Sequence, residues 1–202
     1  EDLRHDEIML MSDIICLTET WLKPDSITDG FKLSGFDLFL NSVGVGRGIS
    51  TYCKPSQGTL QVNITKQSVQ ISQVCAPEVD VINIYRSQGA DNSEVAKDLK
   101  QIINQIKPTI ICGDLNLCYV RQRNNEVTRM LEGQGFRQLV EEASHLQGGH
   151  IDHVYSNLDP DIFKVDIMMY SPYYTSQDHD AFCITIMHKA HKKQTQVLFT
   201  SN

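Results

Sequence analysis

Residues 109–116 read TIICGDLN, and this stretch decides the fold. Its first four residues are apolar or β-branched, which predicts a short buried strand. Asp114 and Asn116 follow that strand directly. Because side chains two apart in an extended chain point to the same side, both are predicted to face one edge of a sheet. The alternative is that Asp114 and Asn116 only form an Asx turn where the strand ends.

Three other segments carry acidic or histidine residues at the ends of predicted strands. They are Glu19 after the apolar run 13–17, Asp152 and His153 in the run 151–155, and Asp178 and His179 before the run 181–187. Taken singly, each is also typical of a solvated turn. A sheet brings strand ends from distant parts of a chain to one edge, where carboxylates can share a cation and a phosphate. Asp152 is predicted to accept a hydrogen bond from the imidazole of His179 and thereby to favour the charged imidazole. Together the four segments predict a metal-dependent phosphodiesterase site.

The elements around these segments predict an α/β fold. Further strands are expected at 36–40, 49–53, 60–64, 69–74, 79–85 and 165–169, and helices at 91–106 and 126–133. This pattern predicts a four-layer α/β sandwich, in which two packed mixed sheets are flanked by helices. Residues 1–188 are predicted to form the domain. Residues 189–202 are polar and aperiodic, so we expect a frayed C-terminal tail.

Composition limits the class of protein. The chain has 202 residues, 41% of them hydrophobic, which suits one globular domain. Its net charge of -7 opposes strong non-specific binding to nucleic acids, although local basic groups exist. No run of eighteen apolar residues occurs, and residues 1–7 have no signal-peptide profile. We therefore expect an intracellular protein, nuclear or cytoplasmic and not secreted, without a membrane partner. Since the chain begins with Glu1, we expect it to be part of a longer polypeptide.

Cysteine and histidine spacing leaves two alternatives open. The six cysteines lack the close pairing of a zinc site and are predicted to be reduced, with no disulfide-linked partner. The alternative is the disulfide framework of a secreted protein. A transition-metal cluster of His145, His150, Asp152 and His153 is a second alternative. It is disfavoured because His153 and Asp152, as neighbours in a strand, point to opposite faces.

Three stretches resemble the endonuclease/exonuclease/phosphatase superfamily, which includes deoxyribonuclease I and the exonuclease III type of AP endonucleases. They are DIICLTETWL at 13–22, NIY at 83–85 and GGHIDHVY at 148–155. The resemblance extends from about residue 13 to residue 187. Within the superfamily the chain looks most like endonuclease domains of LINE-type non-LTR retrotransposons, with Helitron-like elements second.

The resemblance implies a Mg²⁺-dependent DNA-nicking endonuclease, with Mn²⁺ as a possible substitute, inside a larger element-encoded polyprotein that carries a reverse transcriptase. Its cut would leave a 3′-hydroxyl. The implied roles are Glu19 as the main metal ligand, Asp178 near the metal, and Asp114 and Asn116 at the attacking water. His179, oriented by Asp152, and Tyr85 would contact the scissile phosphate, and Asn83, Arg86 and Arg121 would contact the DNA.

The sequence also departs from the family pattern. The strand that normally supplies an Asn ligand is expected before Asp2 and is missing. Gln177 stands where the family usually has Ser, and Arg47 interrupts the glycine run before Ile49. Two other functions therefore stay open: a catalytically dead domain that only binds or packs, and a phosphatase acting on phosphoinositide or lipid phosphate.

Overall fold

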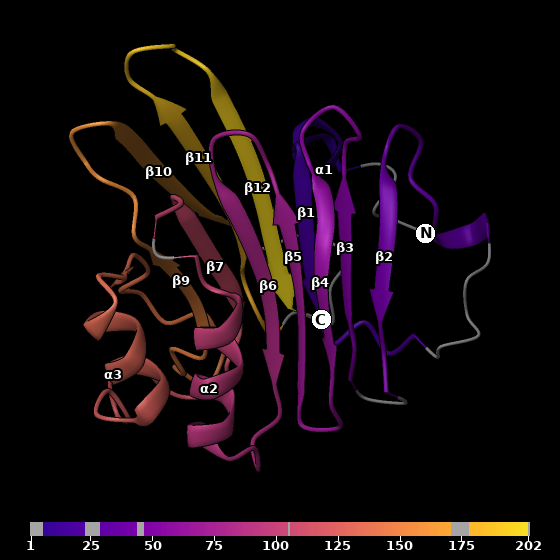
Figure 1. Ribbon diagram of the computed structural model, residues 1–202. Coiled ribbons are helices and arrows are strands. Elements are labelled where there is room, and N and C mark those ends of the chain that lie inside the picture. The colour runs from indigo at the N-terminus through magenta and orange to yellow at the C-terminus, as the bar shows by residue number, and fades with distance from the viewer. Residues whose placement is uncertain (1–5, 23–28, 44–46, 105, 171–177, 202) are drawn as a thin grey trace.

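The computed structural model describes residues 6–22, 29–43, 47–104, 106–170 and 178–201 (Figure 1). In this part of the chain the strands form two six-stranded sheets. Sheet A contains, in spatial order, β10 (Phe163–Tyr170), β11 (Ala181–His188), β12 (Gln194–Ser201), β1 (Ile14–Thr18), β3 (Ile49–Cys53) and β2 (Asp37–Asn41). Sheet B contains β4 (Thr59–Thr65), β5 (Val69–Cys75), β6 (Asp80–Arg86), β7 (Thr109–Asp114), β9 (Asp152–Ser156) and β8 (Arg137–Gln138).

Both sheets are mixed and both are covered by helices, so the predicted four-layer α/β sandwich is confirmed. The parallel pairs are β1 with β12 and β6 with β7. Helices α2 (Asn92–Ile102) and α3 (Glu126–Gly133) lie together on one side of the molecule (Figure 1). Their apolar side chains pack on the outer face of sheet B. The short helix α1 (Glu7–Met11) contributes Met9 to the core on the outer face of sheet A.

Alternation along the strands explains the sandwich and also positions the site. Inward-facing apolar residues of both sheets form the central core, for example Cys16, Val81, Cys112 and Val154. Two residues further toward one end of the sandwich, the same inward rows become polar. Thr18 follows Cys16, Asn83 follows Val81, Asp114 follows Cys112, and Asp152 precedes Val154. Because period-two alternation keeps these side chains on the inner face, one end of the sandwich is polar inside.

Hydrogen bonds join the two sheets at this polar end. Thr51 Oγ1 on β3 lies 2.7 Å from Ser72 Oγ on β5. The side-chain amide of Asn83 on β6 donates to Thr51 Oγ1 at 3.0 Å and to the carbonyl of Leu17 at 3.3 Å. These bonds partner buried polar groups that would otherwise oppose folding. They also fix β1 relative to β6, and therefore Glu19 relative to Tyr85.

The expectation of a frayed tail was wrong for residues 194–201. They form β12, which lies between β11 and β1 (Figure 1). Val197 pairs with Ile14 and Ile184, and Val197, Leu198 and Phe199 are fully buried. A strand covered on both faces carries consecutive apolar residues instead of an alternating pattern, so its signal was missed. The expectation about a strand before Asp2 concerns sequence outside the described residues.

One smaller feature also differs from the sequence prediction. Helix α2 ends at Ile102, and Ile106, predicted on its apolar face, is 94% exposed. Pro108 restricts the backbone before it, which favours an early helix end. All six cysteines are free thiols, and four of them are buried. Among the described residues, no helix has the length and apolar character needed to cross a membrane.

Candidate active site

Glu19, Asp114 and His179 converge at the polar end of the sandwich. Glu19 follows β1, Asp114 ends β7, and His179 precedes β11. Each offers one ligand-type atom, and these atoms all lie within 4.8 Å of one another. Asp152, at the start of β9, is the strand partner of Asp114. Four segments that lie far apart in sequence, two from each sheet, therefore meet at the polar end of the sandwich, as predicted from the sequence.

The backbone at Glu19 is held in an uncommon conformation. Its φ angle is 50°, in the left-handed region that most residues avoid. The next residue, Thr20, donates its N–H to the carbonyl of Gly48 at 3.2 Å. Gly48 has φ 108°, and a Cβ there would lie 3.0 Å from Thr20 Oγ1. Glycine at position 48 thus permits the close approach that fixes the Glu19 turn.

Tyr85 contacts Glu19 directly. Its hydroxyl donates to Glu19 Oε1 at 3.0 Å. Burial first, and then the charge and hydrogen bond of Glu19, raise the pKa of Tyr85. The phenol therefore stays protonated and serves as a donor. The resemblance implied that Tyr85 contacts the scissile phosphate, whereas in the structure its hydroxyl donates to the carboxylate of Glu19.

His179 and Asp152 form the predicted pair. His179 Nδ1 lies 2.7 Å from Asp152 Oδ2, and both side chains are buried. Burial alone would lower the pKa of His179, but the hydrogen bond and charge of Asp152, together with Asp114 and Glu19, raise it to about 9. An imidazolium is consequently expected at neutral pH. It is a strong hydrogen-bond donor placed next to two carboxylates.

Asp114 and Asn116 form an Asx turn and also lie at the candidate site. The two interpretations of this pair, a turn and a position at the site, are therefore compatible. Asn116 donates its N–H to Asp114 Oδ1 at 2.8 Å and its side-chain amide to Asp114 Oδ2 at 2.9 Å. That amide also donates to the carbonyl of Arg86 at 3.0 Å. Burial and the nearby charge of Asp152 raise the pKa of Asp114. Asn116 therefore holds Asp114 in position through both carboxylate oxygens.

The three residues predicted to contact DNA do not lie on an open surface of the site. Arg86 is 4% exposed and donates to the carbonyls of Leu115 and Ala90. Asn83 is fully buried between the sheets. Both residues support the site from within. Arg121 lies in an exposed turn between β7 and α3.

Asp178 and the alternative zinc cluster are not part of the convergent group. Asp178 is exposed, and its carbonyl accepts from the N–H of Leu146. His153 points away from Asp152, as predicted, and its Nε2 lies 2.7 Å from the carbonyl of Leu117. Burial lowers the pKa of His153 to about 4. Across the described residues, the group that could hold a metal is Glu19, Asp114 and His179 instead.

Three residues near the site were not predicted to belong to it. The ring of His145 packs edge-on against His179 with centroids 4.8 Å apart, and its backbone bridges to that residue. The hydroxyl of Ser144 accepts from the N–H of Asp152 at 3.1 Å. Arg47 lines a groove together with Tyr85. Arg47 did have a signal, since it interrupts a glycine run, but the sequence did not connect it to the site.

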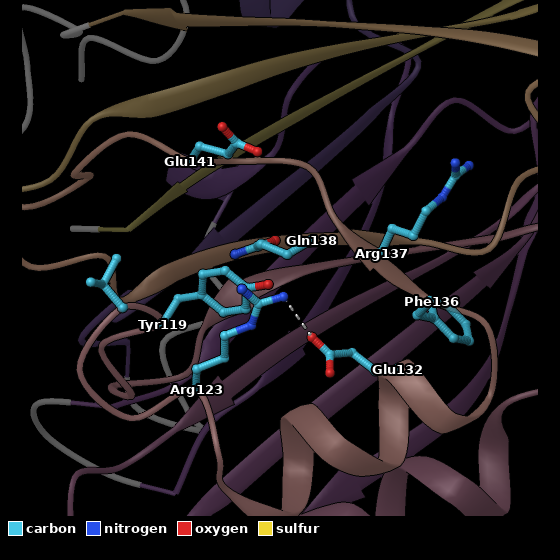
Figure 2. A pocket seen from close by; sticks show the side chains of 8 residues that line it. Tyr119, Arg123, Glu132, Phe136, Arg137, Gln138 and Glu141 are labelled. Carbon is cyan, nitrogen blue, oxygen red and sulfur yellow. Dashed lines mark ion pairs between the residues drawn. The ribbon is translucent and has the colours of Figure 1, made fainter.

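A separate pocket of about 570 Å³ lies between α3, β8 and the turn that carries Tyr119 (Figure 2). Arg123 lies over the ring of Tyr119 at 5.2 Å and is 3.6 Å from the carboxylate of Glu132. Figure 2 shows both charged groups at the same opening. None of the predicted site residues lines this pocket. It is therefore distinct from the Glu19, Asp114 and His179 cluster.

The chain belongs to the endonuclease/exonuclease/phosphatase family, whose model matches residues 3–179. This is the class that the sandwich and its polar end define, and the resemblance inferred from sequence is confirmed. No curated protein matches the chain.

Solved structures of the same fold include the following three. The endonuclease domain of TRAS1, a telomere-specific non-LTR retrotransposon, is 13% identical with a TM-score of 0.63, covering 85% of this chain and 84% of that chain. An AP endonuclease from Archaeoglobus fulgidus is 12% identical with a TM-score of 0.64, covering 88% and 89%. The human Nocturnin catalytic domain with bound sulfate is 12% identical with a TM-score of 0.60, covering 90% and 83%. These likenesses concern the fold.

Proposed function

We propose that the chain is a Mg²⁺-dependent phosphodiesterase that nicks DNA, the endonuclease domain of a mobile element. The observation that carries the proposal is the convergence of Glu19, Asp114 and His179 within 4.8 Å. Membership of the family supports hydrolysis of a phosphate ester. The fold shared with the TRAS1 endonuclease domain supports DNA as the substrate and a larger element-encoded chain as the context.

The donor set fits a hard divalent cation. Glu19 and Asp114 offer carboxylate oxygens, which Mg²⁺ and Mn²⁺ prefer, and no thiol belongs to the group. His179 is a poor ligand because its Nδ1 is taken by Asp152 and its pKa favours the protonated ring. Glu19 is thus the proposed metal ligand. When bound, the cation would polarise a phosphate oxygen and neutralise charge on the leaving oxygen.

The protein groups would then act as follows. Asp114, held by Asn116, takes a proton from the attacking water, a role for which a raised pKa is suited. The water oxygen forms a bond to phosphorus as the bond from phosphorus to the 3′ oxygen breaks, and the 3′ oxygen takes a proton from solvent, leaving a 3′-hydroxyl and a 5′-phosphate. His179, oriented by Asp152, donates from Nε2 to a phosphate oxygen as its negative charge increases. Tyr85 keeps the Glu19 carboxylate in position.

Conversion of supercoiled plasmid to open circle by the purified protein tests the proposal. We expect nicking in Mg²⁺ or Mn²⁺, none in EDTA, and a loss of at least about a hundredfold in Glu19→Ala. Glu126→Ala is the matched control, because Glu126 is an exposed acidic residue on α3 that pairs only with Arg129 among the described side chains. End-labelling of the nicked strand should report a free 3′-hydroxyl.

Two further measurements, made beside the plasmid assay, distinguish the other two functions. A folded protein that nicks no plasmid in either cation, yet binds a DNA duplex, would be a binding domain instead of an enzyme. Metal-dependent release of phosphate from phosphoinositide vesicles without nicking would indicate the phosphatase function. Either result would overturn the proposal.

A further inference from the structure

A polar groove of about 610 Å³ opens beside Tyr85. Among the described residues, the lining side chains are donors or neutral polar groups, and Arg47 is the charged one. They include Gln67 and Ser68 from the turn between β4 and β5, and Ser87 and Gln88 after β6. No carboxylate of the described part of the chain lines the groove, whereas the protein as a whole carries a net charge of -7. The groove therefore has the chemistry of an anion site on an acidic protein.

The groove is joined to the metal-type cluster by two contacts. The carbonyl of Gly48, next to Arg47, accepts from the N–H of Thr20, next to Glu19, at 3.2 Å. Tyr85 lines the groove and donates its hydroxyl to Glu19 at 3.0 Å. The charge of Arg47 is also felt at Tyr85, where it opposes the rise in pKa. A ligand in the groove would thus adjoin whatever the cluster binds.

The guanidinium of Arg47 has N–H donors available to bind an anion. Its side chain is half-buried, and Nη1 donates to the backbone carbonyl of Gln67. A guanidinium has five N–H donors in a planar fork. Within the described part of the chain its hydrogen bond goes to this neutral carbonyl, which orients the fork without neutralising it. Such a held but uncompensated guanidinium matches a phosphate well.

We propose that the Arg47 groove binds a backbone phosphate of the DNA strand adjacent to the scissile phosphate. This inference rests on the proposed function, since it assumes that the cluster beside it holds a phosphodiester. Arg47 would contribute affinity and register, because contacts to phosphate position a duplex without reading its sequence. It would also supply the local positive charge that an acidic nuclease needs in order to hold DNA.

The salt dependence of DNA binding tests the groove. Fluorescence anisotropy of a short fluorescein-labelled duplex is measured in EDTA, to prevent cutting, over a series of NaCl concentrations. We expect Arg47→Gln to weaken binding by about tenfold at low salt and to reduce the slope of log K against log[NaCl] by about 0.9, the loss of one phosphate contact. Arg47→Lys should keep the slope, because the charge is kept.

Arg129→Gln is the matched control. Arg129 is exposed on α3 and pairs with Glu126, far from the lining of the groove. The control should behave as the wild-type protein in affinity and slope. If Arg47→Gln does the same, the groove binds no phosphate. If Arg47→Gln weakens binding with an unchanged slope and a lower Tm, Arg47 only fixes the turn at Gln67, and the proposal is overturned.

Plasmid nicking keeps the two proposals separable. Glu19-dependent nicking by the wild-type protein, combined with a wild-type slope for Arg47→Gln, would support the proposed function and contradict phosphate binding in the groove. Absence of nicking by a folded wild-type protein would contradict the proposed function. The salt slopes would still decide whether Arg47 contacts a phosphate.

Discussion

Nδ1 of His179 lies 2.7 Å from Oδ2 of Asp152, and the two residues belong to segments 27 positions apart. The carboxylate occupies Nδ1 and leaves Nε2 as the other donor of a ring that lies near Glu19 and Asp114. Because it also favours the protonated ring, the same contact sets both the orientation and the charge of the imidazole. The state of His179 therefore depends on Asp152, which needs no contact with the substrate.

Asp152→Asn should lower the pKa of His179 from about 9 toward its ordinary value. We expect nicking to fall by about a hundredfold at neutral pH, since a charged donor to the phosphate is lost. NMR titration of the histidine ring protons in EDTA measures the pKa directly. Asp166→Asn is the control, because Asp166 is exposed on β10 and pairs with Lys164. An unchanged histidine titration in Asp152→Asn would contradict the assignment.

The pH dependence of stability should carry opposite contributions from two histidines. His153 has a folded pKa of about 4 against an ordinary 6.5, so between these values the unfolded state binds more protons. Stability from this source is present at pH 7 and is lost on acidification, by about 3 kcal/mol at pH 4. His179, with its raised pKa, stabilises below 6.5, and this contribution is lost as the pH rises through about 9.

His153→Gln isolates the acidic limb, because glutamine does not titrate and can still donate to the carbonyl of Leu117. Urea unfolding between pH 7 and pH 4 should show a shallower loss of stability in the variant than in the wild-type protein. Parallel curves would mean that His153 is not held neutral in the folded protein.

Tyr85→Phe should raise the concentration of Mg²⁺ needed for half-maximal nicking and lower the rate by about tenfold. The reason is that the Glu19 carboxylate loses the donor that orients it, while the ring keeps its packing. Metal titrations of the nicking rate check this, with Tyr119→Phe as a control that removes a hydroxyl outside the site. A rate loss without any change in metal dependence would place the hydroxyl on the substrate instead.

Phe199→Ala should destabilise the protein by about 3 kcal/mol or more, because Phe199 is fully buried in the central core and stacks on Phe182 at 6.1 Å. Ile106→Ala should change stability by less than about 0.5 kcal/mol, since its side chain is 94% exposed. Chemical denaturation of both variants distinguishes a core strand from a tail. Equal, small effects would show that β12 contributes little to the folded state.

Local pattern predicted most of the fold and the residues that converge at the candidate site. Glu19, Asp114, Asp152 and His179 each adjoin an apolar run, and strand ends in a sandwich meet at shared edges. What the sequence could not supply was the partner of each side chain. Tyr85 on Glu19 and Asn116 on both oxygens of Asp114 depend on distances between strands. Strand β12 was not predicted because burial on both faces removes the alternating pattern. Arg47 was not predicted at the site because only the folded turn brings it beside Tyr85.

The position of β12 has a consequence for biosynthesis. Asp13 and Gln196, 183 positions apart, are hydrogen-bonded, and β12 is the parallel neighbour of the strand that delivers Glu19. Pairing so distant in sequence carries a large loop-closure cost and slows folding. On a ribosome, sheet A would remain without this central strand until the last of these residues had emerged. The cluster of Glu19, Asp114 and His179 would therefore be complete only after residues 194–201 had been synthesised.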